Sequence, residues 1–128
     1  MSIEMSLVHV FHDTFKLPVR LDPTVPSKDE ITLRIKLLRE EVDELEQALL
    51  KGDLVNTLQE LTDIRYVLNG TFLTCGLQRL EEQAFDLVHD ANMNKLWLDG
   101  NPHYNEHGKV IKPPGYKPVD LSVLFKSN

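Results

Sequence analysis

The sequence predicts an all-α fold, an antiparallel four-helix bundle followed by an irregular C-terminal segment. Apolar residues recur at helical spacing in four segments, capping residues stand at two of their starts, and a glycine follows three of their ends. Short turns join the last three segments, which favours antiparallel neighbours. We expect one domain over residues 1–128, with a helical core over about 3–98 and a loop and short helix over 99–128.

The first two predicted helices are separated by a proline-rich loop. One helix covers residues 3–16, where apolar residues recur at intervals of three and four. The next begins at Ser27, because Ser27 and Glu30 have the spacing of a capping box. It is expected to run to about Lys51, with Gly52 as its stop.

Two further helices complete the predicted bundle. Asp53 is a suitable N-cap for a helix that ends at Gly76. A fourth helix is expected from about Gln78 to Leu98, closed by Gly100.

The segment 101–118 holds four prolines and two glycines, so we expect it to be irregular. Residues 105–112 can form a short hairpin. Asp120 is a candidate cap for a last helical turn that reaches Phe125.

Composition and charge exclude several classes of protein. The net charge is −6, which disfavours a general binder of DNA or RNA polymers. Residues 28–63 hold ten acidic and five basic residues, whereas 95–128 hold five lysines and three acids. This contrast suits a cation bound beside an anion, although on charge alone two solvated surfaces are the better explanation. With Cys75 as its single cysteine, and no signal-like or membrane-length apolar stretch, the protein is expected to be cytoplasmic.

Acidic residues fall on the apolar side of the second predicted helix. On a wheel that turns ~100° per residue from Glu40, Leu37 and Leu45 lie near ~60° and ~140° and mark the buried stripe. Glu41 falls near ~100°, within that stripe, and Glu44 near ~40°, at its edge.

The third predicted helix repeats this arrangement. With Glu60 at zero, Val67 lies near ~−20° and Ile64 near ~40°, so Glu60 has apolar neighbours. Asp63 lies one turn along, near ~−60°. Two such motifs on consecutive antiparallel helices indicate a shared site more strongly than a single pair of acids would.

Several buried carboxylates are costly unless their charge is neutralised. Arg34 falls on the same stripe and can neutralise one of them, but not four. A divalent cation can serve the whole cluster, and all-oxygen ligands favour Mg²⁺, Mn²⁺ or Ca²⁺ over Zn²⁺. The alternative is that these acids form solvated helix faces of a non-catalytic interaction module.

These motifs resemble a known signature. Glu40-Glu41-Val-Asp-Glu44 followed by Glu60-Leu-Thr-Asp63 is similar to the EExxE…ExxD pattern of the all-α NTP pyrophosphatase superfamily, which includes MazG-like enzymes, phosphoribosyl-ATP pyrophosphohydrolase and dimeric dUTPases. The segments His89 to Leu96 and Gly108 to Tyr116 resemble a phosphoribosyl-ATP pyrophosphohydrolase-like subgroup. The likeness extends over about residues 7–121.

The resemblance implies a Mg²⁺-dependent enzyme, with Mn²⁺ as a substitute, that cleaves a nucleoside triphosphate to the monophosphate and pyrophosphate. Its metal ligands would be Glu41, Glu44, Glu60 and Asp63. Glu40 would hold a further metal or activate water, so the catalytic residues would be Glu40, Glu41 and Glu44. A homodimer or a dimer of dimers is also implied.

The resemblance further implies that Asn92, Lys95, Lys109 and Lys112 bind the phosphates or sugar of the substrate. Each also has a structural interpretation. Lys95 can complement the end of its helix, and the two loop lysines can be simply solvated. Hydrolysis of phosphoribosyl-ATP is an alternative reaction for the same site.

Other residues have weaker interpretations. Asp86 and His89 form one D-x-x-H pair, whereas a di-iron carboxylate site needs two such pairs, so this site is disfavoured. Trp97 and Tyr104 can stack on a base, but Trp97 near a helix end more often packs in a core or interface. Cys75 is expected to be a small buried residue.

Overall fold

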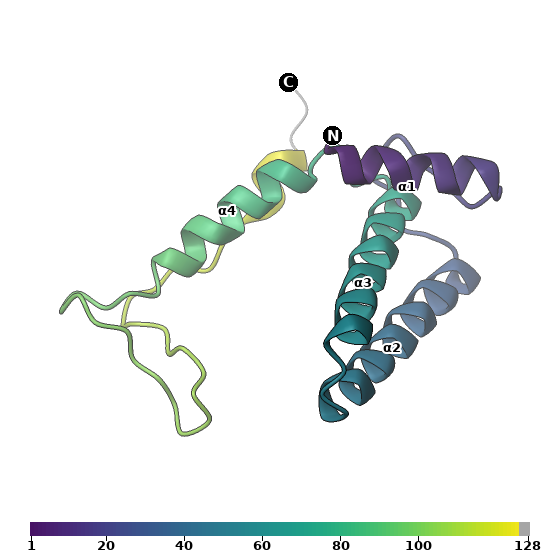
Figure 1. The fold of residues 1–128 in the computed structure, drawn as a ribbon. Helices are drawn as coiled ribbons and strands as arrows, with labels where there is room; N and C mark the ends of the chain where they lie inside the picture. Colours follow the sequence, from purple (N-terminus) through teal and green to yellow (C-terminus); the bar gives the residue numbers. More distant parts are fainter. Residues whose placement is uncertain (126–128) are drawn as a thin grey trace. The chain divides into compact units, whose positions relative to one another are not determined.

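The computed structural model describes residues 1–125, which fall into two compact units, Met1–Arg79 and the residues from Leu80 onward. The all-α prediction is confirmed, because these residues form four α-helices and contain no strand (Figure 1). Four helices are compatible with the predicted bundle. The last three residues of the predicted domain lie outside the described residues, and the assignment of a single domain stays a prediction.

The first unit contains helices α1 (Ile3–Thr14), α2 (Lys28–Leu50) and α3 (Leu54–Cys75). A tight turn joins α2 to α3, and the two long helices lie side by side in opposite directions (Figure 1). Helix α1 packs against α3, where Met5, Val8 and Leu73 form a buried cluster.

Local capping explains where these helices begin and end. The capping box at Ser27 is present, since its side chain accepts from the amide of Glu30 and Glu30 reaches back to the Ser27 amide. Asp53 caps α3 by accepting from the amide of Asn56. Gly76 ends α3 with φ of +69°, and a Cβ there would collide with the carbonyl of Asp22. The predicted stops and starts of α2 and α3 are therefore confirmed to within a residue or two.

The second unit contains α4 (Glu81–Met93) and a short 3₁₀-helix, η1 (Leu121–Phe125). Helix α4 is shorter than the predicted 78–98, because turns replace helical hydrogen bonds on either side of it. The hairpin over 105–112 is reduced to one antiparallel bridge between Tyr104 and Val110. The predicted cap at Asp120 is confirmed, since its carboxylate accepts from the amide of Ser122 at 3.0 Å.

No helix in the described part of the chain is both long and apolar enough to cross a membrane.

The loop between α1 and α2 is tied to the C-terminal end of α3 by Arg20. The guanidinium donates to both carboxylate oxygens of Glu30, at 3.0 and 2.8 Å, and to the carbonyl of Thr74 at 2.6 Å. The Arg20 amide donates to the carbonyl of Leu73, and its own carbonyl accepts from the Gln78 side chain. The contact with Arg20 lowers the pKa of Glu30 to about 2. The loop thus supplies hydrogen-bond donors to carbonyls in the last turn of α3, where helical bonding leaves some carbonyls without a partner.

Two buried polar side chains, Arg34 of α2 and His12 of α1, lie beside Gly70 of α3. Arg34 donates to the carbonyl of Val67 at 2.7 Å and to the hydroxyl of Thr71 at 3.1 Å. It therefore makes its hydrogen bonds with α3, and we correct the expectation that it can neutralise a carboxylate of the acidic motifs. His12 is also buried, and its Nδ1 must carry the proton because it contacts the carbonyl oxygen of Pro18 at 3.0 Å. Burial lowers the pKa of His12, and the charge of Arg34 acts in the same direction.

We predict that Gly70→Ala destabilises the protein, although alanine normally favours a helix interior by ~1 kcal/mol. A Cβ at this position would lie 2.5 Å from Nη2 of Arg34 and 2.7 Å from Nε2 of His12. Forcing these two buried groups apart should cost about 1–3 kcal/mol, which chemical denaturation would measure. Thr62→Ala, on an exposed position of α3, is the matched control and should change stability little. An alanine at position 70 that stabilises the protein would contradict the prediction.

Candidate functional site

The antiparallel pairing of α2 and α3 brings acidic residues of the two motifs together. Glu41 of α2 meets Glu60 and Asp63 of α3, so that one oxygen from each carboxylate lies within 4.8 Å of the others. The i, i+3 spacing places Glu60 and Asp63 on neighbouring positions of one helix, and the partner helix supplies Glu41. We call these three residues the acidic cluster.

The acidic cluster is partly dry and incompletely hydrogen-bonded. Glu60 is only 7% exposed, and Glu41 and Asp63 are half-buried. One oxygen of Glu41 and one of Glu60 are buried without any hydrogen-bond partner. Buried acceptors without partners are uncommon and costly in folded proteins, so these two oxygens are suited to bind a cation.

The electrostatic environment of the cluster opposes ionisation. Burial raises the pKa of Glu60, and the neighbouring Glu41 carboxyl acts in the same direction. Burial likewise raises the pKa of Glu41, with a further contribution from the charges of Glu44 and Asp63. The cluster therefore binds protons more readily than ordinary carboxyl groups do, and a cation would compete with those protons.

Glu44 and Glu40 lie outside the three carboxylates of the acidic cluster. Glu44 is exposed, and hydrogen bonding with the Glu60 carboxyl raises its pKa. Its oxygens do not belong to the group that lies within 4.8 Å. Glu40 is also exposed and outside that group. Asp63 is oriented by Gln59, whose amide nitrogen donates to its two oxygens at 3.1 and 3.3 Å.

The donor set fits a hard divalent cation. Three carboxylates from two rigid helices offer only oxygen ligands, as Mg²⁺ and Mn²⁺ prefer. Mg²⁺ commonly keeps several coordination positions for water and phosphate oxygens, and three protein ligands leave room for them.

The four residues predicted to bind substrate all belong to the second unit, so their role toward the acidic cluster stays a prediction. Asn92 is exposed near the end of α4, and its carbonyl accepts from the amide of Lys95 at 3.1 Å. Lys109 and Lys112 are exposed in the following loop. The ammonium of Lys112 lies 5.6 Å from the centre of the Tyr116 ring.

The same loop contains a cluster of side chains that the sequence pattern does not predict. Trp97 stacks on His103, with ring centroids 4.0 Å apart, and His103 contacts Asp99 at 2.9 Å. His103 therefore covers one face of Trp97, in keeping with the expectation that a tryptophan near a helix end packs within the protein. The spacing of four between Asp99 and His103 was the available signal, but it lies outside a regular helix, where such spacing has no fixed meaning.

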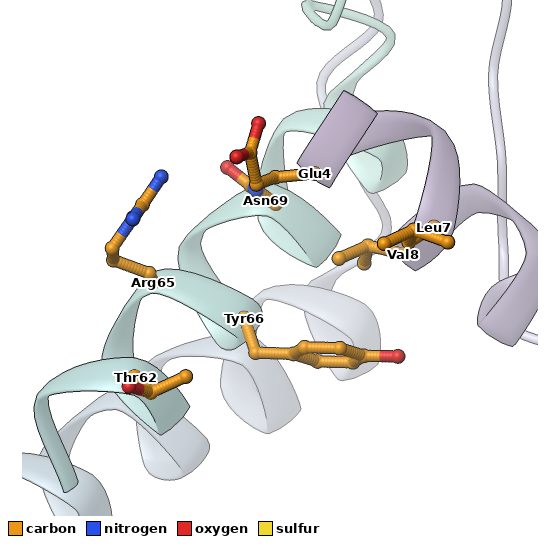
Figure 2. Close-up of a pocket in the computed structure, with 7 residues that line it drawn as sticks. All are labelled: Glu4, Leu7, Val8, Thr62, Arg65, Tyr66 and Asn69. Carbon is orange, nitrogen blue, oxygen red and sulfur yellow. The ribbon is translucent and has the colours of Figure 1, made fainter. Parts of the chain in front are cut away.

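A small pocket between α1 and α3 is separate from the acidic cluster. Figure 2 shows Leu7 and Val8 facing it from α1, and Tyr66 and Asn69 from α3. On the α3 wheel Asn69 lies ~180° from Glu60, so this pocket opens on the opposite side of the helix. Its walls are mostly apolar, and its volume is about 120 Å³.

Comparison of the chain with known protein families identifies its class of enzyme. The chain is an all-helical member of the MazG-like NTP pyrophosphatase superfamily, a hydrolase that acts on phosphoric anhydride bonds. It belongs to the family described as phosphoribosyl-ATP pyrophosphohydrolase, whose model matches residues 8–92. Hydrolases of this family typically depend on a divalent metal. A search of curated proteins finds no match to the chain.

The matched region contains all five acidic residues of the two motifs and ends at Asn92. Lys95, Lys109 and Lys112 lie beyond it.

Proposed function

We propose that the protein is a Mg²⁺-dependent nucleoside triphosphate pyrophosphohydrolase that converts a (d)NTP to its monophosphate and pyrophosphate. The observation that carries the proposal is the pair of buried, unpartnered carboxylate oxygens of Glu41 and Glu60. A divalent cation would satisfy both oxygens and offset the mutual repulsion of the cluster. A housecleaning or pool-balancing role would follow from such an activity.

In this proposal Glu41, Glu60 and Asp63 hold the cation, and Glu44 completes its ligands from the margin of the cluster. The bound Mg²⁺ would neutralise negative charge on the triphosphate oxygens. Glu40 or Glu44, both exposed, would orient the attacking water and accept its proton. Water oxygen bonds to the α-phosphorus, the bond from that phosphorus to the bridging oxygen breaks, and pyrophosphate leaves.

Phosphoribosyl-ATP is the second candidate substrate, favoured by the family match over residues 8–92. Its hydrolysis breaks the same kind of bond and needs the same metal chemistry. Phosphoribosyl-ATP differs from a simple triphosphate by a phosphoribosyl group on its adenine, whereas the proposed metal chemistry acts on the phosphate chain.

A substrate panel tests the proposal. We would measure pyrophosphate release from all common NTPs and dNTPs and from phosphoribosyl-ATP, with Mg²⁺ and then Mn²⁺. Turnover of one or a few triphosphates supports the proposal, whereas exclusive turnover of phosphoribosyl-ATP supports the second candidate. Absence of turnover throughout the panel would favour a non-catalytic interaction module.

We further propose that a second copy of the chain covers an apolar stripe on α3. Only four hydrophobic residues are buried among those described, which is a small core for a chain of this length. Leu54, Val55, Leu58 and Leu61 are 49–84% exposed on one side of α3. Contiguous exposed apolar surface of this kind is typical of an interface.

We predict that the protein is a dimer or a dimer of dimers at micromolar concentration, and that Leu58→Asp dissociates it. The buried aspartate would lose its hydration in the interface without gaining a partner. Light scattering coupled to size exclusion would measure the mass. Asn56→Asp, an exposed polar position on the same helix, serves as control. A monomeric wild-type protein would contradict the proposal.

A further inference from the structure

Trp97, Asp99 and His103 contact one another in the loop that follows α4, and the proposed reaction does not use them. The imidazole of His103 stacks on the indole of Trp97, with ring centroids 4.0 Å apart and planes inclined by 19°. Its Nε2 lies 2.9 Å from one oxygen of Asp99, whose other oxygen accepts from the amide of Asn101 at 2.8 Å. We call Trp97, Asp99 and His103 the loop clamp.

The loop clamp holds the backbone on both sides of one residue, Ile111. The indole nitrogen of Trp97 donates to the carbonyl of Ile111 at 3.0 Å. The amide of Ile111 donates to the carbonyl of His103 at 2.8 Å. Both polar backbone atoms of Ile111 are therefore tied to clamp residues, although the surrounding loop is exposed.

Ile111 stands between the two lysines that are proposed to contact substrate. Lys112 follows it directly, and Lys109 precedes it by two residues. The amide and carbonyl of Lys109 are themselves bonded to Asn105, at 3.0 and 2.9 Å. The backbone that carries both ammonium groups is thus fixed before any ligand arrives.

These hydrogen bonds matter because few other interactions order this segment. It is rich in proline and glycine, and one β-bridge is its sole regular pairing among the described residues. A flexible loop would lose conformational entropy when its lysines engaged an anion, and that loss would weaken binding. A loop ordered in advance avoids the loss.

We propose that Trp97, Asp99 and His103 are positioning residues, which hold Lys109 and Lys112 in place to bind the phosphate groups of the substrate. The inference rests on the proposed function and on the expectation, implied by the family resemblance, that these two lysines contact phosphate. It assigns no chemical step to the clamp, which acts only through the loop backbone.

Steady-state kinetics on the full-length protein test the proposal. His103→Ala removes the stack and the contact with Asp99, and we expect KM for the best triphosphate of the panel and Ki for inorganic pyrophosphate to rise about tenfold, with kcat within twofold. His103→Phe retains an aromatic ring on Trp97 and should restore most of the affinity. His107→Ala is the matched control, since this histidine lies in the same loop but is exposed beside Glu106.

A second set of measurements reports on the order of the loop in the absence of substrate. The amide of Ile111 should exchange its hydrogen at least tenfold faster in His103→Ala than in the wild type. Emission of Trp97, the one tryptophan of the chain, should shift to longer wavelength as the stack is lost. Trp97→Phe, which keeps a ring but removes the indole donor, should also accelerate exchange at Ile111.

The possible outcomes distinguish a failure of the loop-clamp proposal from a failure of the proposed function. If Lys109→Ala and Lys112→Ala raise KM but His103→Ala does not, the clamp proposal is wrong and the lysine contacts stand. If neither lysine variant alters KM or Ki, the proposed phosphate contacts fail, and the positioning role fails with them. Unchanged exchange at Ile111 in His103→Ala would overturn the clamp whatever the kinetics.

Discussion

Glu60→Gln is expected to reduce kcat/KM for pyrophosphate release by at least about 100-fold, because the reaction then loses a ligand of its metal. Glutamine has nearly the same shape but no charge, so the packing between α2 and α3 should persist. Without its cation, the acidic cluster is repulsive, and this variant should be at least as stable as the metal-free wild type. Circular dichroism and a pyrophosphate-release assay would measure the two properties together.

Glu46→Gln provides the matched control. Glu46 is an exposed acid of the same helix as Glu41, and on the α2 wheel it lies ~140° from it. The control should retain full activity. If Glu60→Gln kept more than half of the wild-type activity while Glu46→Gln behaved normally, the acidic cluster would not be the metal centre.

Mg²⁺ is expected to raise the melting temperature of the protein by an amount that grows with pH. At a concentration of about 100 times Kd, a cation that binds only the folded state contributes about 2.7 kcal/mol, or on the order of 10 °C for a chain of this size. Differential scanning fluorimetry at several pH values would measure the shift. Sodium chloride at equal ionic strength controls for screening, and Glu60→Gln should lose the effect.

The pH dependence follows from the raised pKa values of Glu41, Glu44 and Glu60. In the metal-free protein the folded state binds protons more tightly than the unfolded state. The resulting stabilisation is present below the usual carboxyl pKa and is lost as pH rises through the raised values. Mg²⁺ competes with these protons, so its effect should be small near pH 5 and large near pH 8. A temperature shift that did not increase with pH would contradict this account.

The helices of the first unit could be predicted because their signals are local. Ser27, Asp53 and Gly76 each act within a few residues of their position, through side-chain caps or a left-handed backbone. The end of α4 was harder to place. Apolar residues continue at helical spacing beyond Met93, but the helix ends at a turn at Asn94. No glycine or proline at this position marks the end in the sequence.

The acidic cluster was also predictable, since spacing on a helix fixes which side chains share a face. The wheel placed Glu41 within the apolar stripe of α2 and Glu60 among apolar residues of α3, and the antiparallel turn between them brings these faces together. The wheel did not determine which acids lie closest. It placed Glu44 at the edge of the stripe, where Glu44 is exposed, but only the packing of the helices brings Glu41, Glu60 and Asp63 together as the closest three.

Contacts between residues far apart in the sequence could not be predicted from periodicity. Arg34 was placed on the correct stripe, but its hydrogen bonds with Val67 and Thr71 depend on how α2 and α3 pack. The contact of Trp97 with Ile111 depends on the path of an irregular loop. Neither had a signal in spacing or composition.

The hydrogen bonds of Arg20 make the proline-rich linker part of the folded first unit. Because this linker supplies donors to Leu73 and Thr74, cleavage or insertion beside Arg20 would release the last turn of α3 as well as the linker itself. The turn at Gly52 differs, since nothing lies within 4 Å of a Cβ built there. A fusion partner or a spectroscopic label is therefore better introduced in the exposed turn beside Gly52 than in the longer linker that looks more permissive.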